Sequence, residues 1–299
     1  MRGACAQAGV DSVIRFGQRV PAQDRALVMA IVNRTPDSFY DRGAAFADDA
    51  ALARVDAAMA EGADIIDIGG VKAGPGDEVD EAEEIRRVIP FVAEVRNRYP
   101  DVVISVDTWR GEVGRLAVAE GADLLNDTWA GVDPTLGEVA AATGVGIVCS
   151  HTGGATPRLR PHRVRYVDVV ADVIAEVSGQ AERLLALGVP REGIVVDPTH
   201  DFGKNTFHGL ALLRRCDELV ATGWPVLMAL SNKDFVGETL GVPGVADRLE
   251  GTLAATALAA AAGARLFRAH EVGATRRTLD MVAAILGTRP PARTVRALA

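Results

Sequence analysis

Eight short apolar runs, rich in valine, isoleucine and leucine, constrain the fold of this chain more than any other feature of its sequence. They lack the apolar–polar alternation of a strand with one face in water, which favours strands buried on both faces of a parallel sheet. The runs span residues 27–32, 65–68, 102–106, 124–125, 145–148, 194–196, 226–230 and 265–267.

Stretches rich in alanine, glutamate, arginine and leucine at helical spacing lie between the runs. Several end in a glycine just before the next run, where a helix commonly terminates. Eight strand–helix units over roughly 250 residues predict an α/β protein folded as a (β/α)8 TIM barrel, whereas a doubly wound sheet usually needs fewer units. The glycines are Gly62, Gly121, Gly144 and Gly263, and the expected helices span 47–62, 80–98, 110–120, 135–143, 166–188, 208–222, 244–262 and 274–286.

The chain of 299 residues is long enough for two domains, but no stretch has the composition of a linker. Residues 25–287 are therefore predicted to form a single barrel. Residues 1–24 form an N-terminal extension, in which 14–20 is expected to make a hairpin that plugs the bottom of the barrel. Residues 288–299, with two prolines and three arginines, are expected to be a frayed tail.

Charge and cysteine content limit the partners and the compartment. The 32 basic and 40 acidic residues give a net charge of −8, which disfavours nucleic-acid binding. Cys5, Cys149 and Cys216 form no CxxC pair, so neither a disulfide framework nor a cysteine zinc site is indicated, and a reducing cytoplasm is expected. The longest apolar stretch, 253–264, is shorter than the ~20 residues of a membrane span and is interpreted as a buried helix.

A polar or ionisable side chain follows every predicted strand. The C-terminal ends of barrel strands build the active site, so these side chains are expected to share one rim. Polar residues also begin wherever a buried strand stops, which is enough to explain any single position, but all eight together favour a catalytic or ligand-binding rim. The residues are Asn33, Asp67, Asp107, Asn126 with Asp127, His151, Asp197, Ser231 with Lys233, and Arg268 with His270.

Two segments carry a specific family resemblance. Residues 30–39, AIVNRTPDSF, and residues 63–70, ADIIDIGG, resemble the first and second signatures of the dihydropteroate synthases. The resemblance covers about residues 14–286 and supports the TIM-barrel prediction. Segments that resemble later motifs follow in family order at 105–108, 125–127, 196–198, 202–204, 231–233 and 268–270.

This resemblance implies the condensation of a dihydropterin carrying a CH₂-pyrophosphate arm with p-aminobenzoate, with release of pyrophosphate. It implies a pterin pocket in which acids and amides accept protons from the donor edge of the ring. It also implies Mg²⁺ at the pyrophosphate, with Asn33 as the protein ligand. The implied pterin site comprises Asp107, Asn126, Asp197, Lys233 and Arg268, and the implied pyrophosphate site comprises Arg268 and His270.

The site for the aromatic acid departs from the family pattern. The family's Gly-Glu-Ser-Thr-Arg-Pro-Gly reads Gly-Val-Lys-Ala-Gly-Pro-Gly over residues 70–76, so a hydroxyl and a guanidinium are missing. Asp234 replaces a serine at a helix start that should receive the substrate carboxylate, and its charge is expected to repel that group. The altered site comprises Ala73, Gly74, Pro75, Phe202 and Asp234.

Two further substitutions fall near the expected site. The family's Asp-Pro-Gly-Ile-Gly-Phe-Gly-Lys reads Asp-Pro-Thr-His-Asp-Phe-Gly-Lys over residues 197–204, which replaces two glycines and adds an acid. Arg34 replaces a small apolar residue beside Asn33, and it is expected to fold across the phosphate site or to compete with Mg²⁺.

Three functions are compatible with these features. The favoured one is a homologue that keeps the transferase fold and the pterin pocket but in which condensation is absent or very weak. The alternatives are an active dihydropteroate synthase of folate biosynthesis and another pterin-dependent barrel chemistry, such as that of methyl carriers, although nothing in this sequence resembles their corrinoid partner domain. Expected partners are a pterin, sulfonamide- or sulfone-like aromatic compounds and a second copy of the chain through the last helices, with neither nucleic acid nor membrane.

Overall fold

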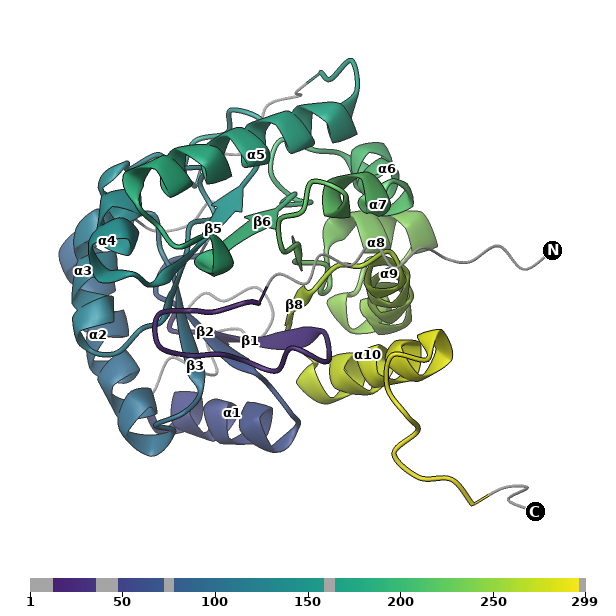
Figure 1. Cartoon of the computed structure of the whole chain (residues 1–299), viewed down its shortest axis with the longest axis horizontal. Coiled ribbons are helices and arrows are strands. Elements are labelled where there is room, and N and C mark those ends of the chain that lie inside the picture. The colour runs from purple at the N-terminus through teal and green to yellow at the C-terminus, as the bar shows by residue number, and fades with distance from the viewer. Residues whose placement is uncertain (1–12, 36–47, 73–77, 159–164, 296–299) are drawn as a thin grey trace.

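The computed structural model describes residues 13–35, 48–72, 78–158 and 165–295. Among these residues, eight parallel strands form one sheet in the order β6-β5-β4-β3-β2-β1-β8-β7, and a parallel bridge between Val196 and Val226 joins its two ends. The sheet closes into a barrel with helices around its outside (Figure 1), which confirms the predicted (β/α)8 fold. The strands are β1 (Leu27–Asn33), β2 (Ile65–Gly69), β3 (Val103–Asp107), β4 (Leu124–Asn126), β5 (Gly146–Ser150), β6 (Ile194–Asp197), β7 (Leu227–Met228) and β8 (Leu266–Ala269).

The helices are placed by local capping signals as well as by their apolar faces. Asp168, for example, accepts hydrogen bonds from the backbone amides of Val170 and Ala171 and so sets the start of α5. No helix in the described ranges has both the length and the apolarity needed to cross a membrane. The helices are α1 (Asp48–Ala60), α2 (Glu81–Arg98), α3 (Gly111–Ala119), α4 (Thr135–Thr143), α5 (Val169–Leu187), α6 (Thr206–Arg214), α7 (Cys216–Val220), α8 (Asp234–Leu240), α9 (Leu249–Ala261) and α10 (Val272–Leu286), with 3-10 turns η1 (Arg191–Gly193) and η2 (Val245–Arg248).

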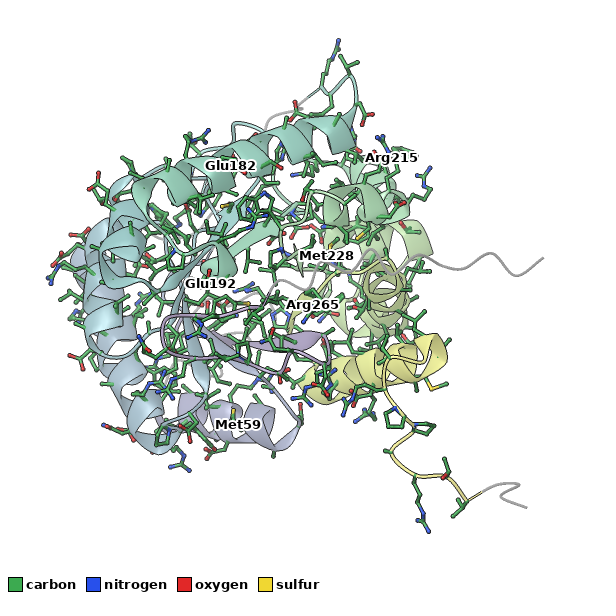
Figure 2. The ribbon with its side chains drawn as sticks, viewed as in Figure 1. Met59, Glu182, Glu192, Arg215, Met228 and Arg265 are labelled. Carbon is green, nitrogen blue, oxygen red and sulfur yellow. The ribbon has the colours of Figure 1, made fainter. Side chains whose placement is uncertain are left out.

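Two helical features differ from the sequence-based prediction. The single helix expected over 208–222 is split into α6 and α7, because the backbone leaves helical geometry at Arg215, with φ −115° and ψ 29°. The Arg215 side chain, labelled in Figure 2, pairs there with Asp168 and Glu218. α8 is absent from the predicted helices because its seven residues are too few to display a periodic apolar face.

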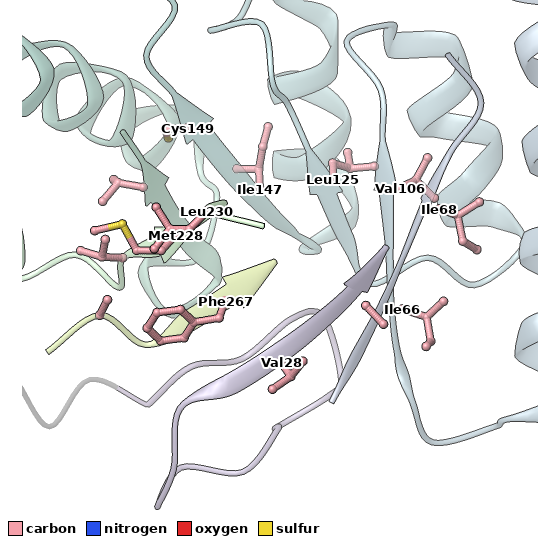
Figure 3. Packing of buried hydrophobic residues seen from close by; sticks show 14 of the residues in the cluster. Val28, Ile66, Ile68, Val106, Leu125, Ile147, Cys149, Met228, Leu230 and Phe267 are labelled. Atoms are coloured by element: carbon pink, nitrogen blue, oxygen red, sulfur yellow. The ribbon is translucent and has the colours of Figure 1, made fainter. Parts of the chain in front are cut away.

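Side chains alternate between the inside and the outside of the barrel along each strand. On β1, Val28 and Ala30 belong to the core shared with the helices, which Figure 3 shows from close by, whereas Leu27 and Met29 belong to a second, interior cluster. This interior cluster is apolar and fills the N-terminal half of the barrel. Its strand residues are Leu27, Met29, Ile65, Val103, Leu124, Val148, Val195, Leu227 and Leu266.

A short N-terminal segment completes the interior cluster. Ile14 and Phe16 are fully buried and pack with the inward-facing strand residues. Phe16 also pairs with Arg19 in an antiparallel bridge. Gly146 is required opposite this segment, because a Cβ at that position would lie 2.4 Å from Phe16 Cδ1. The segment therefore covers the N-terminal end of the barrel interior.

Candidate functional site

The same strand alternation places polar side chains at the C-terminal mouth of the barrel. The register sets Asn33 beside Gly69, Gly69 beside Asp107, and Asp107 beside Asn126 on four successive strands. Ser150 of β5 lies beside Asp197 of β6. These inward-facing residues are thus brought to one rim above the apolar interior, whereas His151, one position after Ser150, contacts Asp172 of α5 instead.

Arg268 links two acids within this rim. Its Nε donates to Asp67 Oδ2 at 2.6 Å, and its Nη2 donates to Asp107 Oδ2 at 2.8 Å. Burial, partly opposed by the charge of Arg268, raises the pKa of Asp107 to about 7. Burial lowers the pKa of Arg268, but the two carboxylates raise it by more. One cation therefore holds two acids together in a poorly solvated mouth.

Asn126 extends this network and has an unused oxygen. Its side-chain nitrogen lies 3.3 and 3.4 Å from the two Asp67 oxygens, and Ser105 Oγ donates to Asp67 Oδ1 at 2.6 Å. Because a carboxylate accepts hydrogen bonds, this contact fixes the orientation of the Asn126 amide. Asn126 Oδ1 is buried and has no hydrogen-bond partner among the described residues. A ligand that brings an N–H or O–H donor would complete the network.

The loop after β6 is fastened by a buried lysine. Lys204 Nζ donates to the carbonyl oxygens of His151 and Thr199, each at 3.0 Å, and of Phe202 at 2.9 Å. Burial lowers the pKa of Lys204 to about 7. The Thr199 amide in turn donates to Asp197 Oδ1 at 2.7 Å, and burial raises the pKa of Asp197 to about 6. The loop is thereby tied to the chain at the end of β5.

Lys233 is paired with an acid of the same loop. Its Nζ donates to Asp201 Oδ2 at 2.5 Å, and both side chains are partly exposed. Lys233 and Arg268 also act on Asp197, whose pKa their charges lower against the larger effect of burial. The lysine expected in a pterin site therefore already has an anionic partner, at a position where the family motif carries glycine.

His270 lies at the rim and is neutral at pH 7. Burial, followed by the charges of Arg268 and Lys233, lowers the pKa of His270 to about 3. Ser231 Oγ lies 3.1 Å from His270 Nδ1 and donates to Glu271 Oε2 at 3.1 Å. Since the serine proton goes to Glu271, His270 Nδ1 acts as the donor to Ser231.

Aromatic side chains line the loop that carries Phe202. The Phe202 and Trp129 rings are 4.4 Å apart between centroids, and Trp129 meets Trp109 edge-on at 6.3 Å. Asp127 holds the Trp129 turn, because its two oxygens accept from the Trp129 amide at 2.9 Å and the Gly131 amide at 2.6 Å. Phe202 therefore belongs to a packed aromatic group whose backbone is independently anchored.

Two charged substitutions have partners elsewhere in the fold. Asp234 begins α8, and its carboxylate accepts from Arg248 Nη1 at 2.8 Å, so its negative charge is compensated. The Arg34 guanidinium lies over the Phe91 ring of α2, 4.6 Å from the centroid. The expectation that Arg34 folds across the phosphate site is therefore wrong, because this side chain packs into the helix layer. Ala73, Gly74 and Pro75 lie outside the described residues.

Three residues of the network had no assigned role in the sequence analysis. Asp67 could have been assigned, since it lies on the inward-facing side of its strand, one layer below Asp107 and beside Ser105. Asp201 and Lys204 could not, because the contacts that join them to Lys233 and to the His151 carbonyl span separations that no local spacing rule predicts.

The fold and the rim define a class of protein: a (β/α)8 barrel with a polar rim at its C-terminal mouth, the place where barrels of this kind carry their active sites. The sequence matches the family described as Pterin binding enzyme over residues 29–270. It is 68% identical over 285 residues to the Inactive dihydropteroate synthase 2 of Mycobacterium leprae (strain TN), a match covering 94% of this chain and 98% of the relative.

Two solved structures are also similar. The dihydropteroate synthase of Yersinia pestis, in complex with a sulfonamide drug, is 35% identical with a TM-score of 0.84, covering 90% of this chain and 96% of that one. The enzyme of Thermus thermophilus, in complex with 4-aminobenzoate, is 39% identical with a TM-score of 0.81, covering 91% and 99%. The chain belongs to the dihydropteroate synthase family of pterin binding enzymes.

Proposed function

We propose that this protein binds a pterin at the barrel mouth and condenses a pterin pyrophosphate with p-aminobenzoate very weakly or not at all. The observation that carries the proposal is the buried, unpartnered Asn126 Oδ1 beside the network of Asp67, Arg268 and Asp107. The donor edge of a dihydropterin supplies the N–H group that this oxygen lacks. In this proposal Asp107, Asn126 and Asp197 accept from the ring, Lys233 donates to it, and Arg268 stacks over its face.

Weak condensation is supported by the loop after β6. Lys233 must share its charge between the ligand and Asp201. Thr199 holds a left-handed backbone, with φ 48°, at a position where the family motif has glycine, so this loop also carries local strain. The Mycobacterium leprae relative, with 68% identity, is itself named inactive.

A Mg²⁺ site fits the oxygen donors at the end of β1. A Cβ built on Gly69 would lie 3.7 Å from Asn33 Oδ1 and 3.9 Å from Asp107 Oδ2, so the two oxygens border one space. Mg²⁺ prefers oxygen ligands and keeps several waters, so Asn33 would hold it together with phosphate oxygens. When bound, the ion stabilises negative charge on a departing pyrophosphate. Arg268 and His270 would contact the pyrophosphate from the side of β8.

Binding and turnover are tested separately on the purified protein. Calorimetric titration with the dihydropterin pyrophosphate and Mg²⁺ should detect binding, while pteroate formation with p-aminobenzoate should be at least ~100-fold slower than in the Thermus thermophilus enzyme. Failure to bind the pterin pyrophosphate would reject the pocket. Turnover close to that of the Thermus enzyme would instead support the alternative of an active synthase.

We also propose a homodimer through α9 and α10, which lie side by side (Figure 1). Leu258, Met281 and Ile285 on these helices are 67%, 62% and 69% exposed, and a second copy of the chain would cover them. Sedimentation velocity should give a dimer for the parent and a monomer for Leu258→Glu with Ile285→Glu. Leu187→Glu, which changes an exposed leucine of α5, should stay dimeric. A monomeric parent would reject the proposal.

Aromatic ligands and a cellular location are proposed as well. Sulfonamide-like aromatic compounds are proposed as weak ligands, because the Yersinia pestis relative is solved with a sulfonamide drug but the aromatic-acid loops differ here. A cytoplasmic location is proposed because Cys149 and Cys216 are free and buried, as is usual in a reducing compartment.

A further inference from the structure

A second group of ligand-type side chains lies outside the rim, on the side of the barrel covered by α5. His151 follows the last residue of β5, and Asp172 and Glu176 lie four residues apart on one face of α5. His151 Nε2 is 2.8 Å from Asp172 Oδ1 and 3.3 Å from Glu176 Oε2. One ligand atom from each of the three residues lies within 4.8 Å of the others.

Among the described residues, no lysine or arginine forms a direct ion pair with Asp172 or Glu176. Lys204 acts on it electrostatically, but its ammonium donates to three backbone carbonyls rather than to the carboxylates. Asp172 and Glu176 carry like charges one helical turn apart, and both approach the same His151 nitrogen, so the two carboxylates repel each other. A cation between the carboxylates would remove this repulsion.

The donor set and its spacing suit a transition-metal ion. Two ligand atoms bound to one ion at ~2.1 Å stand about 3.0 to 3.4 Å apart in octahedral or tetrahedral geometry, close to the two distances from His151 Nε2. The imidazole is fully buried, and without an ion its Nε2–H donates to Asp172 Oδ1 at 2.8 Å. An ion would replace this proton, and the ring proton would then sit on Nδ1, which has no partner among the described residues. Asp172 is half exposed, which leaves a path for an ion.

We propose that His151, Asp172 and Glu176 bind a divalent transition-metal ion of the Zn²⁺ type, at a site separate from the rim. One imidazole nitrogen with two carboxylates favours Zn²⁺ over Mg²⁺, which takes oxygen ligands almost exclusively. The positive charge of Lys204 opposes the ion and sets a limit on its affinity. Because Lys204 joins the His151 carbonyl to those of Thr199 and Phe202, a bound ion would also stiffen the loop that carries Asp201.

Zn²⁺ titration of the full-length, chelator-treated protein tests the site. The parent should bind with a Kd of ~1 µM or tighter, and Asp172→Asn and Glu176→Gln should each weaken binding at least ~10-fold. Glu182→Gln is the matched control, since Glu182 is an exposed acid farther along α5, labelled in Figure 2, and should bind like the parent. Both amide variants should keep the parent's thermal stability in chelator, which separates loss of the site from loss of the fold.

Hydrogen exchange supplies a second measurement. Zn²⁺ should slow amide exchange over residues 199–204 in the parent and in Glu182→Gln, but not in Asp172→Asn. No Zn²⁺ binding by the parent, unchanged binding in both Asp172→Asn and Glu176→Gln, or equally tight binding of Mg²⁺ would each overturn the proposal. None of these results depends on whether the protein binds a pterin.

Discussion

Lys233 Nζ and Asp201 Oδ2 lie 2.5 Å apart, and this ion pair joins the rim of the barrel to the loop in which the chain departs from its family motif. Any ligand that needs the Lys233 ammonium competes with Asp201 for it. The pair is partly exposed, so solvent weakens it, and such pairs contribute at most about 1 kcal/mol. Asp201 is therefore expected to tune pterin affinity rather than abolish it.

Asp201→Asn should raise pterin affinity about 2- to 5-fold, because it removes the competing charge and keeps the side-chain volume. Calorimetric titration with the dihydropterin pyrophosphate measures the change. Asp217→Asn, which neutralises an exposed acid of α7, is the matched control and should leave affinity unchanged. An affinity for Asp201→Asn equal to or below that of the parent would mean that Asp201 does not hold Lys233 away from the ligand.

Pterin binding should depend on Asn126 and on the ionisation of Asp197. Asn126→Ala removes the unpartnered acceptor and should weaken binding by roughly one to two decades, from a loss of about 1 to 3 kcal/mol. Because burial raises the pKa of Asp197 to about 6, its carboxylate becomes protonated as the pH falls through that value, and affinity should fall with it.

Asp197→Asn separates this titration from other causes. Its affinity should be low at all pH values and keep only the dependence contributed by Asp107, whose pKa burial raises to about 7. Asn126→Ala should keep the full pH dependence of the parent at a lower affinity. A parent whose pterin affinity stays flat between about pH 5 and pH 8 would show that neither acid binds the ring in its ionised form.

The barrel and the acids of its rim could be predicted from the sequence, because both follow from short-range regularities. Buried strands are unbroken apolar runs in the sequence. Because side chains alternate along a strand, the inward-facing residues Asp107, Asn126 and Asp197 at the strand ends must lie at the barrel mouth. The side-chain pairings could not be predicted. From the sequence alone, Asp234 is an unpaired charge at a helix start, but the fold brings Arg248 next to it. Arg34 is adjacent to Asn33 in sequence, but in the fold its guanidinium packs on Phe91.

His200 provides a stability test of the same loop. It is 3% exposed, its ring stacks on Phe235 at 5.5 Å, and neither ring nitrogen has a partner among the described residues. His200→Ile, which restores the family residue, should raise the free energy of unfolding by about 1 to 3 kcal/mol at neutral pH, because it removes a buried polar group without partners. Chemical denaturation of the two proteins measures the difference.

The gain from His200→Ile should grow in acid. Burial lowers the pKa of His200 to about 3, whereas an unfolded histidine has a pKa of about 6.5. Between these values the unfolded chain binds the additional proton, so stability linked to His200 is present above pH ~6.5 and is lost as the pH falls toward ~3. At about pH 5 the free energy of unfolding of His200→Ile should therefore exceed that of the parent by a further ~2 kcal/mol. If the difference in free energy of unfolding between the two proteins is instead smaller at this pH, the buried ring is protonated in the folded protein.

Condensation should be recovered by restoring the residues that the family carries in two loops. The triple variant Ala73→Thr, Gly74→Arg and Asp234→Ser restores the hydroxyl and guanidinium of the family loop and removes the acid at the start of α8. Because Arg248 already compensates Asp234, this variant should gain less than one that also carries Asp201→Gly and so releases Lys233. The loss of one charge-stabilising donor commonly costs about 10²- to 10³-fold in rate, so the quadruple variant should form pteroate at least ~100-fold faster than the parent.

Pteroate formation from the dihydropterin pyrophosphate and p-aminobenzoate is the measurement, and Asp201→Gly alone is the control. The control should bind the pterin more tightly without a matching rise in turnover, because the aromatic-acid loop is still incomplete. If the quadruple variant binds the pterin well and remains as slow as the parent, the missing donors and the Asp201 pair are not the cause, and the side chains of Thr199 and His200 become the residues to replace. If the parent already turns over as fast as the Thermus thermophilus enzyme, these substitutions do not impair catalysis and the protein is an active synthase with an altered aromatic-acid site.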